Sequence, residues 1–218
     1  MASRLVGNVR DAVGGRRTVV FDLGGVVVRW SDEWLFARVA RELRRPRERV
    51  RRAMLRAVAP LESGRIGRRE FWDRVARALR CRIPDAVRRL WVGVFRSRVR
   101  RRPDLLRWMQ ELRSAGFGVA CFSNTDRSHV GVLRARGWLA PFSPAVLSYR
   151  LGALKPTRRA FDLARRALHR PAAALFFLDD RPENVAGARR AGWGAARFVS
   201  TARARRSFAR WVRARQSS

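Results

Sequence analysis

The sequence has 218 residues and a formal net charge of +33, with 50 lysine and arginine residues against 17 acidic ones. Its two cysteines are too few for a disulfide framework, and no stretch approaches the roughly 20 consecutive apolar residues of a membrane helix. The first 17 residues contain no hydrophobic signal segment. We therefore expect a reduced, cytoplasmic protein without a membrane partner, long enough for one domain with an inserted module.

The basic charge is spread along the chain instead of being gathered in one segment. Lys155 is the only lysine, so the other 49 basic residues are arginines, a skew typical of GC-rich coding. The C-terminal segment 201–218 has six arginines and no acid. This spread argues against specific nucleic-acid binding and leaves non-specific binding of polyanions open. A single surviving lysine indicates a position that needs a compact ammonium group.

The first half of the sequence predicts one strand followed by a long helical segment. Residues 17–22 contain an apolar run that ends at Asp22, and a pair of glycines follows after Leu23. This pattern predicts a buried strand followed by a tight turn. From residue 31 the apolar spacing is helical, with further helices expected over 47–58, 68–80 and 84–97, and no strand is expected between 30 and 102. We expect an inserted helical cap at 31–100 and an irregular or weakly helical lead-in over 1–16.

The second half alternates strands with helices. Four further strands are expected, over residues 117–122, 145–148, 174–178 and 195–199. Helical patterns lie between them, and a last basic amphipathic helix is expected over 202–214. Such alternation predicts an α/β fold, a Rossmann-like doubly wound parallel sheet whose core comprises 17–30 and 101–218.

Polar side chains stand where four of the expected strand segments end. They are Asp22, Ser123 and Asn124, Lys155, and the pair Asp179 and Asp180. The carboxyl ends of parallel strands meet at one edge of a sheet, so these groups are expected to converge. Three carboxylates would repel one another without a hard cation such as Mg²⁺, and an ammonium beside them suits phosphoryl transfer. Helix capping would explain each residue singly, but not the residue types in this order.

Four ordered motifs resemble those of the haloacid dehalogenase-like hydrolase superfamily. They are Asp22-Leu23-Gly24-Gly25-Val26, Ser123-Asn124-Thr125, Lys155-Pro156 and Asp179-Asp180. The sequence is most similar to the branch with a helical cap after the first motif, of the glucose-1-phosphate phosphatase and epoxide hydrolase N-terminal phosphatase type. The resemblance covers 19–199 and implies a Mg²⁺-dependent phosphatase that hydrolyses a small phosphorylated metabolite, such as a sugar phosphate, through an aspartyl-phosphate.

The resemblance also implies a role for each matching residue. Asp22 would be the catalytic nucleophile and a Mg²⁺ ligand, and Lys155 would clamp both Asp22 and the phosphoryl group. Ser123 and Asn124 would bind phosphate together with Lys155. The remaining metal ligands would be the Gly24 carbonyl, Asp180 and, directly or through water, Asp179. Asn184 would either steady the metal site or simply be a residue at the start of the following helix.

One position departs from the superfamily pattern. Gly24 stands where most of its phosphatases carry a second Asp that acts as general acid and base. The chain is then a slower phosphatase, a dehalogenase that uses the same Asp nucleophile, or a basic phosphate- or nucleic-acid-binding protein on a weakly active scaffold. His129 is a candidate substitute acid, with simple packing as its other interpretation.

The cap is expected to select the substrate. Trp34, Glu62 and Arg65 are candidate lining residues. The alternatives are that Trp34 packs in the helical core and that Glu62 is paired with an arginine. We expect a monomer or a homodimer.

Overall fold

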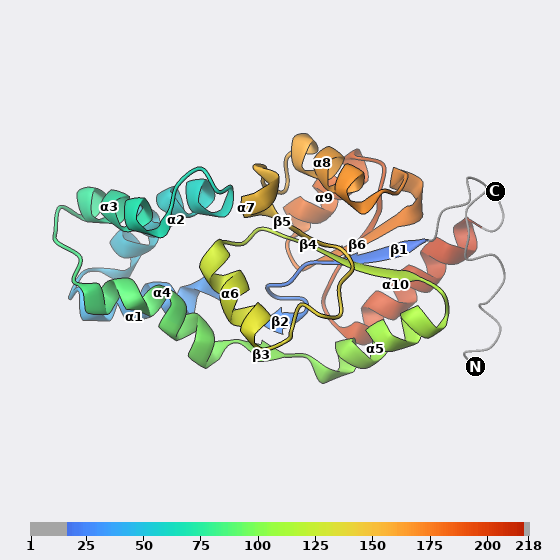
Figure 1. The fold of residues 1–218 in the computed structure, drawn as a ribbon, viewed down its shortest axis with the longest axis horizontal. Helices are drawn as coiled ribbons and strands as arrows, with labels where there is room; N and C mark the ends of the chain where they lie inside the picture. Colours follow the sequence, from blue (N-terminus) through green and yellow to red (C-terminus); the bar gives the residue numbers. More distant parts are fainter. Residues whose placement is uncertain (1–16, 216–218) are drawn as a thin grey trace.

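The computed structural model describes residues 17–215 and is built around a five-stranded parallel sheet (Figure 1). Its strand order is β5-β4-β1-β6-β7. The bounds are β1 (Thr18–Phe21), β4 (Gly118–Ser123), β5 (Ala145–Leu147), β6 (Leu175–Asp179) and β7 (Gly194–Arg197). The chain winds outward in both directions from the central β1, so the predicted doubly wound fold is confirmed.

Helices cover both faces of this sheet, because its strands are apolar on both sides. In β1, Val19 and Phe21 belong to the apolar cluster on one face of the sheet, and Val20 belongs to the cluster on the other face. The helices on the first face are α5 (Pro103–Ser114) and α10 (Thr201–Ala214). Those on the second face are α8 (Arg158–Leu168) and α9 (Pro182–Arg190), and Figure 1 shows the two pairs above and below the sheet.

Four helices between β1 and α5 form a separate layer with an apolar cluster of their own (Figure 1, left). They are α1 (Asp32–Glu42), α2 (Arg47–Glu62), α3 (Arg68–Leu79) and α4 (Asp85–Arg98). All four were expected, although α2 runs four residues beyond its predicted end and so carries Glu62 in its last turn.

A short ribbon joins this helical layer to the sheet, and it corrects one expectation. Strands β2 (Val28–Arg29) and β3 (Arg100–Arg101) pair antiparallel. Strand β3 lies inside the interval 30–102, where no strand was expected. A two-residue strand has no periodicity that a sequence pattern could reveal. The adjacent Trp30 packs against the apolar clusters of both the sheet and the helices.

Three short elements complete the described chain. They are α6 (Arg127–Ala135), α7 (Ser148–Leu151) and the single-turn helix η1 (Ala172–Ala174). The Asp126 carboxylate caps α6 by accepting from the backbone N–H groups of Ser128 and His129. Within residues 17–215, every helix is too short or too polar to span a bilayer. The expected lead-in over 1–16 lies outside the described residues.

Candidate active site

Asp22 follows β1 at the carboxyl edge of the sheet. Its backbone N–H donates to the carbonyl of Leu178 at 2.9 Å, which continues the pairing with β6 and fixes the residue. The residue is only 7% exposed. Burial raises the pKa of Asp22 from 3.8 to about 6; the Lys155 ammonium opposes this rise and the Asp179 carboxylate adds to it. Asp22 is therefore an ionised, poorly hydrated carboxylate at neutral pH, as a nucleophile requires.

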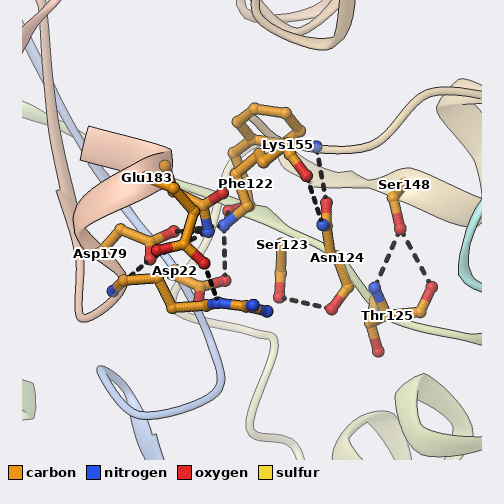
Figure 2. Close-up of polar contacts among 11 residues, drawn as sticks. Asp22, Phe122, Ser123, Asn124, Thr125, Ser148, Lys155, Asp179 and Glu183 are labelled. Atoms are coloured by element: carbon orange, nitrogen blue, oxygen red, sulfur yellow. Dashed lines mark hydrogen bonds and ion pairs between the residues drawn. The ribbon is translucent and has the colours of Figure 1, made fainter. Parts of the chain in front are cut away.

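Lys155 places its ammonium group between two carboxylates (Figure 2). Its Nζ lies 3.0 Å from Asp22 Oδ1 and 2.6 Å from Asp179 Oδ2, and it donates to the Phe122 carbonyl at 3.1 Å. Burial lowers the pKa of Lys155, but the two carboxylates outweigh this effect and raise it above its usual value. The only lysine of the sequence thus fills a site with three converging acceptors, which suits a compact ammonium better than a planar guanidinium.

Asp179 is fully buried, and other protein groups already hold both of its carboxylate oxygens. Besides Lys155, the Asn184 side chain donates to both oxygens at 3.1 and 3.0 Å, and the Arg181 backbone N–H donates to Oδ1 at 2.9 Å. Asn184 therefore steadies Asp179, as expected. With so many donors around it, Asp179 is better placed to orient Lys155 than to take a metal ion alone.

Asp180 is the more accessible carboxylate of the pair. Burial raises its pKa, and the charge of Asp179 adds to the rise. Gly25 lies directly against it: a Cβ on Gly25 would come within 2.1 Å of Asp180 Oδ2, and the φ of Gly25 is +76°. Glycine is therefore required at position 25 by both space and backbone conformation.

The three carboxylates form a cluster whose chemistry fits a hard cation. One oxygen each of Asp22, Asp179 and Asp180 lies within 4.8 Å of the others. The ammonium of Lys155 faces this cluster. Burial is the main cause of the raised pKa of both Asp22 and Asp180, and the charge of Asp179 adds to each rise. Oxygen donors in this number and charge are those that Mg²⁺ prefers.

Ser123 and Asn124 follow β4 beside Asp22, but their side chains are used differently. The Ser123 hydroxyl is buried and donates to the Asn124 carbonyl at 3.3 Å. The Asn124 amide bridges the Lys155 backbone: its Nδ2 donates to the Lys155 carbonyl, and its Oδ1 accepts from the Lys155 N–H, both at 3.0 Å. Asn124 therefore holds the lysine loop. Its contact with phosphate stays a prediction, and its backbone would have to make that contact because its side-chain amide is already bonded.

A cavity of about 430 Å³ lies between this sheet edge and helices α1, α2 and α4. Its acidic lining residues are Asp22, Asp32, Glu33, Glu62 and Asp180, and its basic ones are Arg51, Lys155 and Arg181. Acidic groups thus outnumber basic ones here, in a chain where basic residues are about three times as common. Gly24 also lines the cavity, and a Cβ built on it would meet no atom within 4 Å.

Of the three residues expected to line the site from the cap, only Glu62 does so. Burial raises the pKa of Glu62 to about 8, and the charges of Asp32, Asp126 and Asp22 contribute, in that order. The ion pairs found within residues 17–215 include none at its carboxyl, and Arg181 is the arginine whose charge opposes the rise in its pKa. Trp34 is 42% exposed and packs edge-on against Trp30, and Arg65 donates to the Ser63 hydroxyl, both away from the cavity.

His129 lines the cavity, but its ring nitrogens are engaged. Its Nε2 lies 3.0 Å from the Trp91 carbonyl and its Nδ1 lies 3.2 Å from Asp126 Oδ2. The ring is stacked between Trp91 and Phe95 of α4, at centroid distances of 5.0 and 4.0 Å. His129 therefore joins α6 to the cap, and the packing interpretation is favoured over a substitute acid.

Sequence reasoning missed Ser148, the residue that connects the cap to the site. The buried Ser148 hydroxyl donates to the Glu62 carbonyl at 2.6 Å. It also accepts from the Thr125 N–H at 2.9 Å, a contact drawn in Figure 2. A single serine at the end of an apolar strand has no pattern that could have singled it out. It becomes recognisable only when β4, α2 and α7 come together.

Comparisons with known proteins agree with the fold. The family model of the haloacid dehalogenase-like hydrolases matches residues 16–192, which is most of the chain. No significant match was found among curated proteins. Many solved structures share the fold.

Three of these structures represent the range of similar proteins. A haloacid dehalogenase (HAD) family enzyme from Bacteroides thetaiotaomicron is 19% identical with a TM-score of 0.72, covering 86% of this chain and 95% of its own. The same enzyme in complex with magnesium and inorganic phosphate is 18% identical with a TM-score of 0.68, and the match covers 86% of this chain and 96% of its own. L-2-haloacid dehalogenase from Xanthobacter autotrophicus, with chloropropionic acid covalently bound, is 19% identical with a TM-score of 0.61. The match covers 85% of this chain and 79% of the dehalogenase. Such low identity shows the shared fold alone.

Proposed function

Because this chain belongs to the haloacid dehalogenase-like hydrolases, we propose that it is a Mg²⁺-dependent phosphatase that releases phosphate from a small phosphorylated metabolite. The observation that carries this proposal is the arrangement around Lys155. Its ammonium lies between Asp22 and Asp179, and Asp180 completes a cluster of three carboxylates at the same sheet edge. This set supplies a nucleophile, a counter-charge for a phosphoryl group and oxygen ligands for a cation in one place.

Asp22 is the proposed nucleophile. A carboxylate oxygen of Asp22 attacks phosphorus, the bond from phosphorus to the leaving oxygen breaks, and the electron pair of that bond stays on the leaving oxygen. The product is an aspartyl-phosphate, which water then hydrolyses to restore Asp22. Lys155 holds Asp22 in place and offsets the charge on the phosphoryl oxygens. Ser123 lines the same cavity, and its hydroxyl would donate to one of these oxygens in exchange for its bond to the Asn124 carbonyl.

Asp22, Asp180 and the Gly24 carbonyl would hold Mg²⁺, with Asp179 as a further ligand directly or through water. Bound there, the ion would neutralise part of the charge on the transferring phosphoryl group. The magnesium and phosphate held by the similar Bacteroides enzyme support this assignment. Gly25 leaves room for Asp180, because a side chain at position 25 would displace the Asp180 carboxylate.

The cavity wall indicates the class of leaving group. Its cap half carries Asp32, Glu33 and Glu62, whereas Arg51 is already paired with Glu33 at 2.8 Å. A second phosphate or carboxylate on the substrate would meet these carboxyl groups, while hydroxyl groups could bond to them. We therefore favour a neutral, hydroxyl-bearing leaving group, consistent with a sugar phosphate of the kind handled by the glucose-1-phosphate phosphatase branch.

Dehalogenation is the second candidate. It is favoured by Gly24, which offers no acid beside the nucleophile, and by the similar fold of L-2-haloacid dehalogenase. The acidic pair of Asp179 and Asp180 argues against it, because a halide displacement by Asp22 needs no cation site. The two reactions release different products and are easily separated.

The test is phosphate release from p-nitrophenyl phosphate and a panel of phosphorylated metabolites, with and without EDTA. We expect activity that needs Mg²⁺ and is lost in Asp22→Asn, while the exposed control Asp162→Asn behaves as wild type. Neutral sugar phosphates should be better substrates than bisphosphates. Full activity in Asp22→Asn, or metal-independent halide release from 2-haloacids, would contradict the proposal.

A further inference from the structure

The reaction needs a proton donor that the residues around Asp22 do not supply. When the bond from phosphorus to an alkyl oxygen breaks, the leaving oxygen carries the electron pair and must be protonated. Lys155 is held by three acceptors, and Asp179 is surrounded by donors. Gly24 lines the cavity two residues after Asp22, but it has no side chain that could act as an acid. The sheet edge thus provides a nucleophile and a cation site but no spare acid.

Glu62 is a carboxyl group of the same cavity that remains uncommitted. Among the other acidic groups of the cap wall, Glu33 is held by Arg47 and Arg51, both at 2.8 Å, and Asp32 accepts from the Trp30 indole at 2.8 Å. The Glu62 side chain takes part in no hydrogen bond or ion pair with any residue in 17–215. It lines the cavity together with Asp22, Gly24 and Asp180.

The cap segment that carries Glu62 is fixed to the core close to the nucleophile. The Ser148 hydroxyl donates to the Glu62 carbonyl at 2.6 Å and also contacts both the N–H and the carbonyl of Thr125, at 2.9 and 3.2 Å. Two residues later, Gly64 has a φ of +71° and packs so tightly that a Cβ would lie 2.3 Å from the Tyr149 carbonyl. Glu62 is therefore on a rigid support that also holds the loop after Ser123.

The surroundings of Glu62 keep it protonated at neutral pH. Burial raises its pKa to about 8, with help from Asp32 at the start of α1, Asp126 at the cap of α6 and Asp22 after β1. Arg181, at the start of α9, opposes the rise. A carboxylic acid that retains its proton near neutral pH is a competent proton donor.

We propose that Glu62, a residue of the cap, is the general acid and base of this reaction. This inference rests on the proposed phosphatase function. Protonated Glu62 gives its proton to the leaving oxygen as that oxygen separates from phosphorus, and becomes a carboxylate. The carboxylate then accepts a proton from the water that attacks the phosphorus of the aspartyl-phosphate. Asp22 and phosphate are released, and Glu62 is protonated again.

The experiment compares two esters in wild type and Glu62→Gln. p-Nitrophenyl phosphate has a leaving group that departs as a stable anion, whereas an alkyl phosphate, such as a sugar phosphate hydrolysed by the wild type, needs the proton. Glu62→Gln should lower kcat/KM for the alkyl ester by about 10²- to 10⁴-fold and leave kcat/KM for p-nitrophenyl phosphate within a few-fold. The exposed cap residue Glu70, paired with Arg74, gives the matched control Glu70→Gln, which should change neither value.

Two further readouts separate catalysis from folding. In wild type, kcat/KM for the alkyl ester should fall as the pH rises above about 8, where Glu62 loses its proton, and Glu62→Gln should lack this limb. The space beside Gly24 accommodates a side chain, so Gly24→Asp in the Glu62→Gln background should restore part of the alkyl-ester activity. If Glu62→Gln does not fold, Glu62→Asp takes its place in the same comparison.

The outcomes distinguish this inference from the proposed function. If the wild type hydrolyses neither ester, the proposed function itself is wrong. If the wild type hydrolyses both and Glu62→Gln lowers kcat/KM for both equally, or for neither, the phosphatase assignment stands and the acid–base role of Glu62 is overturned. A loss of kcat/KM in Glu62→Gln for the alkyl ester alone supports the acid–base role of Glu62.

Discussion

The Lys155 ammonium lies 2.6 Å from Asp179 Oδ2, and both side chains are buried. Around this pair the carbonyl of Phe122, the amide of Asn184 and the carboxylate of Asp22 complete a closed polar network. Such a network is costly to break, because removing one partner leaves the other charges buried without compensation. Lys155, the lysine proposed to act in catalysis, is thus also a structural residue of the sheet edge.

Lys155→Met should lower the free energy of unfolding by about 3–5 kcal/mol, the range for removing one partner of a buried pair. Lys155→Arg should fail to restore activity, because a planar guanidinium cannot meet three converging acceptors. Urea unfolding and phosphate release measure the two effects. The exposed pair Arg158–Asp162 gives the control Arg158→Ala, expected to cost less than about 1 kcal/mol. A Lys155→Met protein as stable as wild type would show that the network is not coupled in this way.

Asp22 should make the metal-free protein less stable as the pH rises. Its pKa is about 6 in the folded protein against 3.8 ordinarily, so the folded state binds more protons than the unfolded chain between these values. The stability that Asp22 contributes is therefore present below pH 3.8 and lost as the pH rises through about 6. In EDTA, urea midpoints should show Asp22→Asn gaining stability relative to wild type over this interval. A difference that does not change with pH would contradict the raised pKa.

Adjacent glycines offer a matched pair of substitutions at the proposed metal site. Gly25→Ala forces a Cβ against Asp180 at a φ of +76°, so it should cost about 1–3 kcal/mol and abolish the rise in Tm caused by added Mg²⁺. Gly24→Ala has open space and ordinary backbone angles, so its stability should match wild type. Thermal unfolding over a Mg²⁺ titration measures both. Equal stability and equal Mg²⁺ response in the two variants would show that Gly25 does not position Asp180.

Ser148→Ala should loosen the cap. The change removes the hydroxyl that connects Glu62 to Thr125, leaving buried backbone groups unpaired at a cost of about 1–3 kcal/mol. Amide hydrogen exchange should become faster in the last turn of α2, and the alkyl-ester kcat should fall because Glu62 is less well placed. Ser97→Ala, which removes only an exposed bond to the Val94 carbonyl, is the control. Unchanged exchange in α2 would mean that other contacts hold the cap closed.

The sheet and the convergence of its polar residues were predictable because local patterns determine them. Apolar runs end where Asp22, Ser123 and Asp179 stand, and parallel strands bring such ends together. The ribbon of β2 and β3 was not predictable, because pairing across some seventy residues leaves no local signal in two-residue strands. The division into cap and core at residues 31 and 100 remains a prediction.

Within the site, residue types were easier to anticipate than the partners of each side chain. The environment of Lys155 follows from the strand ends, so its place beside the carboxylates could be inferred from the sequence. The roles of Glu62 and His129 depend on contacts between distant segments: Ser148 is 86 residues from Glu62, and Trp91 is 38 residues from His129. No spacing rule links such residues, so which of them packs and which faces the cavity emerged only from the folded chain.

The central claim, that Asp22 carries the phosphoryl group, is tested most directly by trapping the intermediate. The enzyme is mixed with Mg²⁺ and p-nitrophenyl phosphate, quenched with acid, treated with borohydride to reduce any acyl phosphate, and digested for mass spectrometry. We predict reduction of residue 22 to homoserine only when substrate and Mg²⁺ are both present, and none in an Asp22→Asn sample. Turnover that leaves residue 22 unmodified, or an acyl phosphate on another carboxylate, would contradict the account.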